Sequence, residues 1–175
     1  MCSSDLGARD QLLHPGRILL GASKSKQAIV LDLAEPAKAT KQGLPLTWPR
    51  DKQTGVPASC AVKQLPSWLQ ELLAAKGKQP DDQVGVPLSL HFARELLPTE
   101  IASVTCTFTA DRGEVDGVFA CAQRDGIPSE VAQGCFVFVP LEPLPKSRAL
   151  KVEWTVPPTL LQKREKFAPV AFSIQ

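Results

Sequence analysis

The sequence predicts a mainly β protein: an antiparallel β-sandwich with one short helix, preceded by a remnant strand of an upstream α/β domain. Three observations favour this fold class. Short apolar or alternating runs recur along most of the 175 residues. Turn-forming Gly, Pro and Asp residues separate these runs. The chain also contains 16 prolines, a high proportion that disfavours a helical bundle and marks the ends of strands.

The first part of the chain predicts one strand and a linker. An apolar run at 27–33, preceded by turn residues at 21–25, predicts the strand. Residues 7–34 are too few to bury a core of their own, so we expect them to belong to a domain that lies upstream. Prolines and a glycine at 35–47 are typical of a linker. The sandwich is therefore expected to occupy residues 48–175.

One helix is predicted at 67–76. Ser67 and Gln70 have the spacing of a capping box, and Gly77 provides a stop. The apolar face of this helix carries four side chains: Trp68, Leu69, Leu72 and Leu73. We expect this face to pack over an open end of the sandwich, and the alternative is that it binds a partner.

Strands are predicted after the helix at 86–92, 101–109, 115–121, 135–139, 149–156 and 167–174. The alternation is clearest in the fifth of these, in which the side chains expected to face the core are Leu150, Val152, Trp154 and Val156. In the first strand, the same alternation predicts that His91 points to solvent.

The chain contains five cysteines, an odd number. Cys2 belongs to residues 1–6, which resemble the translated end of a common sequencing adapter and are expected to be an artefact. On this hypothesis the chain is a carboxy-terminal fragment that lacks its signal peptide. A natural Ser-rich amino terminus is the alternative.

Four cysteines remain, and their separation fits no zinc motif: Cys60, Cys106, Cys121 and Cys135. An even set in a strand-rich chain predicts two disulfides and an oxidising, extracellular or cell-surface location. A hairpin centred between Gly113 and Glu114 would place Cys106 opposite Cys121, and Cys60 would then pair with Cys135 by elimination. Four buried thiols in a cytoplasmic protein are the alternative.

Charge and motif content disfavour several classes of protein. The 20 Lys and Arg against 18 Asp and Glu give a net charge of +2, which predicts no nucleic-acid partner. No apolar run reaches the ~20 residues of a membrane span. The two histidines lie beside no nucleophile motif, so we expect no enzyme, no cofactor and no metal. Acidic residues at 111–117 indicate turns, with calcium binding as the alternative.

The segments 48–57, 84–92, 137–144 and 149–156 follow one another in the order of known motifs. They resemble, in turn, YPxDGxTGVP, GYPVSLxF, LxPxxPL and YTVTVSG. These motifs belong to the region after the CAP (SCP-like) domain in some secreted bacterial proteins. Residues 7–34 are similar to the end of the CAP domain itself. The chain departs from the family in its longer helix and in having no tyrosine.

The resemblance implies a fibronectin-like or Ig-like domain at 48–175, joined to the tail of a truncated CAP domain. It implies a non-catalytic extracellular accessory domain whose partners are the upstream CAP domain and a protein or glycan at the cell surface. The alternative is a carbohydrate- or cell-wall-binding module that uses exposed tryptophan. Trp48 and Trp68 are its candidate contacts, because Trp154 is expected in the core. The cleft residues of the CAP family would lie upstream of Gly7, so none is carried over.

Overall fold

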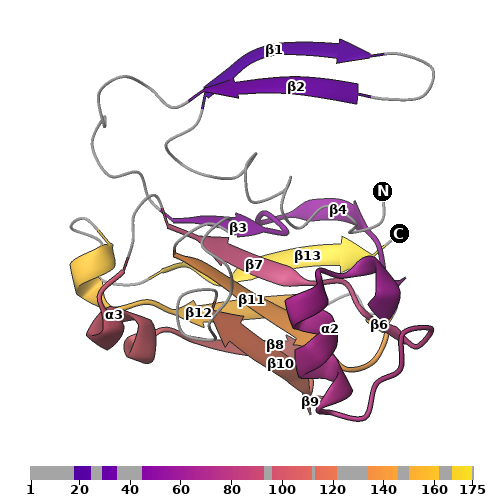
Figure 1. Ribbon diagram of the computed structural model, residues 1–175. Coiled ribbons are helices and arrows are strands. Elements are labelled where there is room, and N and C mark those ends of the chain that lie inside the picture. The colour runs from indigo at the N-terminus through magenta and orange to yellow at the C-terminus, as the bar shows by residue number, and fades with distance from the viewer. Residues whose placement is uncertain are drawn as a thin grey trace.

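The computed structural model describes residues 18–24, 29–34, 45–92, 96–111, 113–121, 134–145, 150–161 and 167–174 (Figure 1). The expected adapter residues 1–6 and most of the expected linker lie outside the described residues. The helices are α2 (Ser67–Ala74), α3 (Pro98–Ser103) and the 3-10 helices η1 (Val62–Gln64) and η2 (Pro158–Leu160). The strands are β1 (Ile18–Lys24), β2 (Ile29–Ala34), β3 (Leu46–Trp48), β4 (Gln53–Val56), β5 (Ser59–Ala61), β6 (Gln83–Gly85), β7 (Leu88–His91), β8 (Thr105–Ala110), β9 (Gly113–Glu114), β10 (Gly117–Cys121), β11 (Cys135–Pro140), β12 (Leu150–Thr155) and β13 (Val170–Ile174).

Two sheets form the body of the protein. A four-stranded sheet has the order β10-β11-β7-β3, and a five-stranded sheet has the order β4-β13-β12-β8-β9. All neighbours are antiparallel except β4 and β13, which run parallel. The predicted mainly β fold class is therefore confirmed, although the five-stranded sheet is mixed rather than purely antiparallel. β1 and β2 pair with each other as a separate two-stranded sheet, where the sequence predicted one strand and a turn.

A large apolar cluster fills the space between the two sheets. Phe108 of β8 is fully buried and stacks on Phe172 of β13, with the ring centroids 6.0 Å apart. It also contacts Phe138 of β11 edge-on at 6.2 Å, which joins the five-stranded sheet to the four-stranded one. The inward face predicted for β12 is confirmed, because Leu150, Val152 and Trp154 are buried while the residues between them are exposed.

A third layer covers the other face of the four-stranded sheet. It consists of α2, η1 and the β5–β6 pair, and a second apolar cluster lies beneath it. Leu69 and Leu73 of α2 are fully buried in this cluster together with Val137 and Val139 of β11. The apolar face of the helix is therefore confirmed as a packing face. Its expected place over an open end of the sandwich is wrong, since it packs against a sheet face.

His91 is buried, so the prediction that it points to solvent is wrong. Every residue of β7 and of β11 is buried, because both faces of the four-stranded sheet are covered. Alternation along such a strand no longer separates an inner face from a solvent face. The imidazole Nε2 of His91 lies 2.9 Å from the hydroxyl of Ser89, so two polar side chains of the same strand face satisfy each other.

Two expected strands differ from the structure. Residues 101–103 belong to α3, and β8 begins only at Thr105. The predicted hairpin exists only at its tip, where β8 pairs with the two residues of β9. The chain then leaves the five-stranded sheet, and β10 pairs with β11 in the other sheet.

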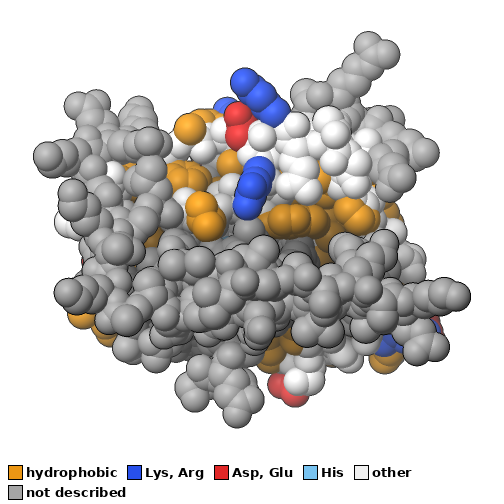
Figure 2. All heavy atoms as spheres, turned by 90° about the horizontal axis from the view of Figure 1, so that it is seen from above, with side chains coloured by type: hydrophobic (Ala, Val, Ile, Leu, Met, Phe, Trp, Pro, Cys, Tyr) orange, Lys and Arg blue, Asp and Glu red, His pale blue; other side chains and the backbone are white. Residues whose placement is uncertain are grey.

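The face of the protein that looks upward in Figure 1 is shown in Figure 2. Among the described side chains in this view, hydrophobic groups lie beside a few Lys or Arg and Asp or Glu side chains. The described part of this face therefore carries charges of both signs rather than a patch of one sign.

Candidate functional site

A groove of about 280 Å³ lies between η1, α2 and the segment after α2. Its lining combines apolar and polar side chains: Val62, Ser67, Gln70, Glu71, Ala74, Lys78 and Pro80. Ser67, Gln70, Glu71 and Ala74 come from one face of the helix, because their spacing places them on successive turns. This face lies away from Leu69 and Leu73, which anchor the helix to the sheet beneath.

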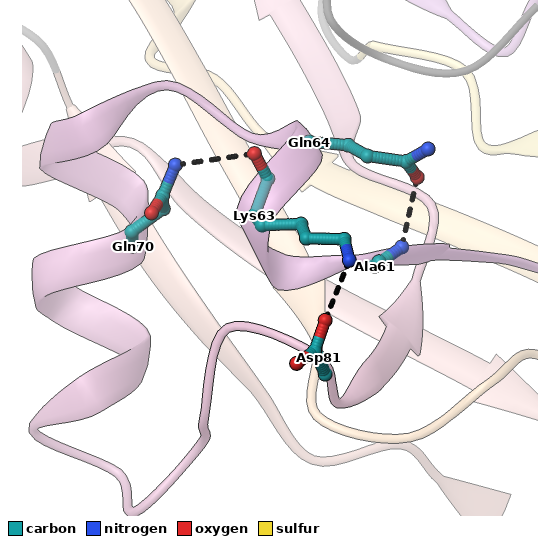
Figure 3. Close-up of polar contacts among 5 residues, drawn as sticks. All are labelled: Ala61, Lys63, Gln64, Gln70 and Asp81. Atoms are coloured by element: carbon teal, nitrogen blue, oxygen red, sulfur yellow. Dashed lines mark hydrogen bonds and ion pairs between the residues drawn. The ribbon is translucent and has the colours of Figure 1, made fainter.

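The amide of Gln70 fixes the corner between η1 and α2. Its Nε2 donates a hydrogen bond of 2.6 Å to the carbonyl of Leu65. A longer bond of 3.5 Å joins the same Nε2 to the carbonyl of Lys63 (Figure 3). The helix begins after Pro66, and no side chain caps its amino terminus. The predicted capping box of Ser67 and Gln70 is therefore wrong, because Gln70 bonds to carbonyls that precede the helix.

The carboxyl end of α2 turns the chain back into the groove. Gly77 has a φ of +82°, the left-handed conformation that glycine adopts at little cost. The amide of Gly77 bonds to the carbonyl of Ala74 at 2.9 Å, and the amide of Lys78 bonds to that of Leu73 at 3.1 Å. These two bonds form a Schellman motif, so the predicted stop at Gly77 is confirmed. The motif places Lys78 at the rim of the groove.

Hydrogen bonds join the segment after α2 to η1. The amides of Val62 and Lys63 bond to the carbonyls of Asp82 and Pro80, at 3.0 and 2.8 Å. The ammonium of Lys63 also pairs with the carboxylate of Asp81 at 2.6 Å (Figure 3). This ion pair is exposed and contributes little to stability. The backbone bonds, in contrast, hold the two sides of the groove at a fixed distance.

The charged groups of the groove differ in their partners. Lys78, whose side chain is 18% exposed, pairs with Glu142 at 2.8 Å. Glu71 is exposed, and no cation among the described residues pairs with it. The groove thus offers one unneutralised carboxylate, the hydroxyl of Ser67 and an amide oxygen on Gln70. The apolar atoms of Val62, Ala74 and Pro80 lie beside these groups.

The structure separates the two members of each predicted disulfide pair, and all four cysteines carry thiols. Cys106 lies opposite Trp154 in the five-stranded sheet, whereas Cys121 lies opposite Phe136 in the four-stranded sheet. The register that was to join Cys106 to Cys121 is therefore wrong, because the chain changes sheets between them. Burial raises the pKa of the Cys106 thiol to about 12.

Cys60 and Cys135 are also distant from each other. The thiol of Cys60 lies 4.0 Å from the carbonyl of Gly85, and Gly85 packs against Pro140 at the end of β11. Cys135 begins the same strand, and five residues of strand, roughly 16 Å at 3.3 Å per residue, separate it from Pro140. A disulfide needs Cα atoms within roughly 7 Å. The extracellular location was inferred from disulfides, and the described residues contain no disulfide. This location therefore stays a prediction.

The two candidate tryptophans do not meet in one site. Trp48 of β3 is half-buried against the cluster between the sheets, and Trp68 of α2 is half-buried against the second cluster. The indole Nε1 of Trp68 is buried without a hydrogen-bond partner among the described groups. Both rings are half-buried against different clusters, and the glycan hypothesis stays a prediction. Trp154 is buried, as expected.

The comparisons with known proteins place the chain in no family. No family model, no curated protein and no solved structure matches it. Within the described residues, no group of three or more His, Cys, Asp or Glu side chains could hold a metal ion, and no helix there is long and apolar enough to cross a membrane. The resemblance to the region after a CAP domain stays a prediction.

Proposed function

We propose that this chain is a non-catalytic binding domain that holds part of a partner polypeptide in the groove between η1, α2 and residues 78–80. The observation that carries the proposal is that the groove is already formed. Its sides are joined by the bonds of Gln70 to Leu65 and of Lys63 to Pro80. The ion pair with Glu142, which lies outside the groove, fixes the side chain of Lys78. A preformed site loses little conformational entropy when it binds, so even a small contact area can be productive.

The size of the groove favours a polypeptide over a small molecule. Sites for drug-sized ligands have volumes of about 300–1,000 Å³. The groove, at about 280 Å³, lies below this range and suits one side chain with its neighbouring backbone. Its lining also supports a binding role over catalysis, because no base among the described residues hydrogen-bonds to the hydroxyl of Ser67 to activate it.

The wider setting comes from the sequence resemblance alone. We extend the proposal to an accessory domain of an extracellular protein, joined to an upstream CAP domain. The coding sequence upstream of Gly7 tests this extension, which is supported if a CAP domain is encoded there and contradicted if none is.

A peptide selection tests the binding function. A random dodecapeptide display library is selected on the whole chain, and the binders are measured against Ala74→Trp, which fills the groove. Ala102→Trp is the matched control, because Ala102 is an exposed helical alanine of α3. We expect most selected peptides to lose at least about tenfold in affinity for Ala74→Trp and to keep their affinity for Ala102→Trp. Peptides that bind both variants equally would contradict the proposal.

A further inference from the structure

We propose that the groove receives a basic side chain, arginine or lysine, of the partner polypeptide. This inference rests on the proposed binding function and adds the chemistry of the occupant. Three properties of the lining favour a basic guest: its unneutralised charge, its hydrogen-bond acceptors and its apolar surface.

The charge of the groove favours a cationic guest. The two ammonium groups next to the groove are already neutralised, Lys78 by Glu142 and Lys63 by Asp81. The carboxylate of Glu71 has no cation partner among the described residues. An acidic guest would have to break an existing ion pair and would face Glu71 at short range. A basic guest would pair with Glu71 and disturb nothing.

The hydrogen-bonding groups of the lining point to the same occupant. Gln70 uses its Nε2 for the carbonyls of Leu65 and Lys63, so its Oε1 is the part of the amide that can serve a guest. Glu71 can only accept, and the hydroxyl of Ser67 can accept as well. A guanidinium carries five donors and no acceptor, and an ammonium carries three donors. Donor-rich basic groups therefore match a lining that presents acceptors.

The apolar part of the lining suits the stem of a basic side chain. Val62, Ala74 and Pro80 offer aliphatic surface beside the polar groups. Arginine and lysine bury their methylene stems against such surface while the charged end stays with polar groups or water. The small side chain of Ala74 leaves room on the helix face one turn beyond Gln70 and Glu71.

The probe for the test is N-acetyl-L-arginine methylamide, added to the whole chain and followed by the backbone amide signals in NMR spectra. We expect saturable shifts at Ser67, Gln70, Glu71 and Lys78. Glu71→Gln should weaken binding of the probe by about three- to tenfold, because a charge-assisted hydrogen bond is lost. Glu114→Gln removes the same charge from the exposed β9 strand and should leave the affinity unchanged. Added salt should also weaken binding.

Two further probes separate the outcomes, namely the N-acetyl methylamides of glutamate and of leucine. Shifts of the same groove amides by either of these, equal to those caused by the arginine probe, would overturn the inference. The absence of shifts with the arginine probe up to about 50 mM would overturn it as well. The proposed function is judged separately, because selected peptides without Arg or Lys that still depend on Ala74 would uphold binding while refuting the basic occupant.

Discussion

Replacing Phe108 by alanine tests how the two sheets pack. The side chain of Phe108 is fully buried, stacks on Phe172 at 6.0 Å and contacts Phe138 of the opposite sheet at 6.2 Å. Removing a buried phenylalanine costs about 3–5 kcal/mol. We expect the upper half of this range, because each aromatic pair contributes about 0.5–1.5 kcal/mol beyond the buried area.

The assay is urea unfolding followed by the fluorescence of the three tryptophans, of which Trp154 is buried in the core. With a slope of about 2 kcal/mol per molar urea, a loss of 4 kcal/mol lowers the midpoint by roughly 2 M. Thr107→Ala is the matched control on the same strand, because Thr107 is exposed. It should change stability by less than about 1 kcal/mol.

A loss below about 1 kcal/mol for Phe108→Ala would refute this account of the core. A loss for Thr107→Ala as large as that for Phe108→Ala would refute it too, because the inward and outward faces of β8 would then be reversed.

Other predictions concern single contacts. Gly117→Ala should cost about 1–3 kcal/mol in chemical unfolding, because a Cβ atom there would lie 2.6 Å from Cε1 of Phe138; unchanged stability would contradict this. The raised pKa of Cys106 means that the unfolded chain, with an ordinary pKa of 9.0, loses this proton before the folded chain does as the pH rises. Between about pH 8 and about pH 10 the wild type should therefore lose about 1 kcal/mol more stability than Cys106→Ala, and parallel pH curves would argue against the burial of this thiol. Gln70→Leu should cost about 1 kcal/mol, because it leaves the carbonyl of Leu65 without its bond, and faster hydrogen exchange of the α2 amides would report the loosened corner; unchanged exchange would show that Gln70 does not hold it.

Local sequence patterns correctly predicted elements whose structure depends on nearby residues alone. β12 alternates strictly between core and solvent, so its inward face was evident from the sequence. Gly77 likewise predicted the end of α2, because the left-handed conformation of this one residue is sufficient to end the helix. In both places the local signal agrees with the tertiary structure.

Predictions failed where a segment's surroundings come from distant parts of the chain. His91 alternates like a surface residue, but a third layer built largely from residues 59–85 covers that sheet face. Between β9 and β10 the chain passes from one sheet to the other. The sequence does not show this change, because side chains alternate with a period of two in strands of either sheet. β3, β5 and β6 span three residues each, too few for any alternation to be detected.

The helix α3 had a local signal that the apolar pattern concealed. Pro98 stands at its first position, and the carboxylate of Glu100 accepts a bond of 2.8 Å from the amide of Leu97. These are start signals of a helix. The following residues Ile101 and Val104 were instead assigned to a strand, since a short run of apolar residues fits either structure.

The groove itself had no signature in the sequence. Its lining is assembled from η1, one face of α2 and the turn at Gly77, and the residues Ser67, Glu71 and Lys78 form no motif. The bonds of η1 to residues 80 and 82, the bond of Gln70 to Leu65 and the turn at Gly77 together bring these groups to one place.

The central claim is that this chain binds its partner in that groove. Cross-saturation NMR with the tightest selected peptide measures this directly, because magnetisation passes only to protein amides that lie against the peptide. We expect loss of signal at the amides of the groove residues, with little effect on the amides of β8 and β12; the groove residues that have amides are Val62, Ser67, Gln70, Glu71, Ala74 and Lys78. Loss of signal centred on another surface, with the groove amides unaffected, would contradict it.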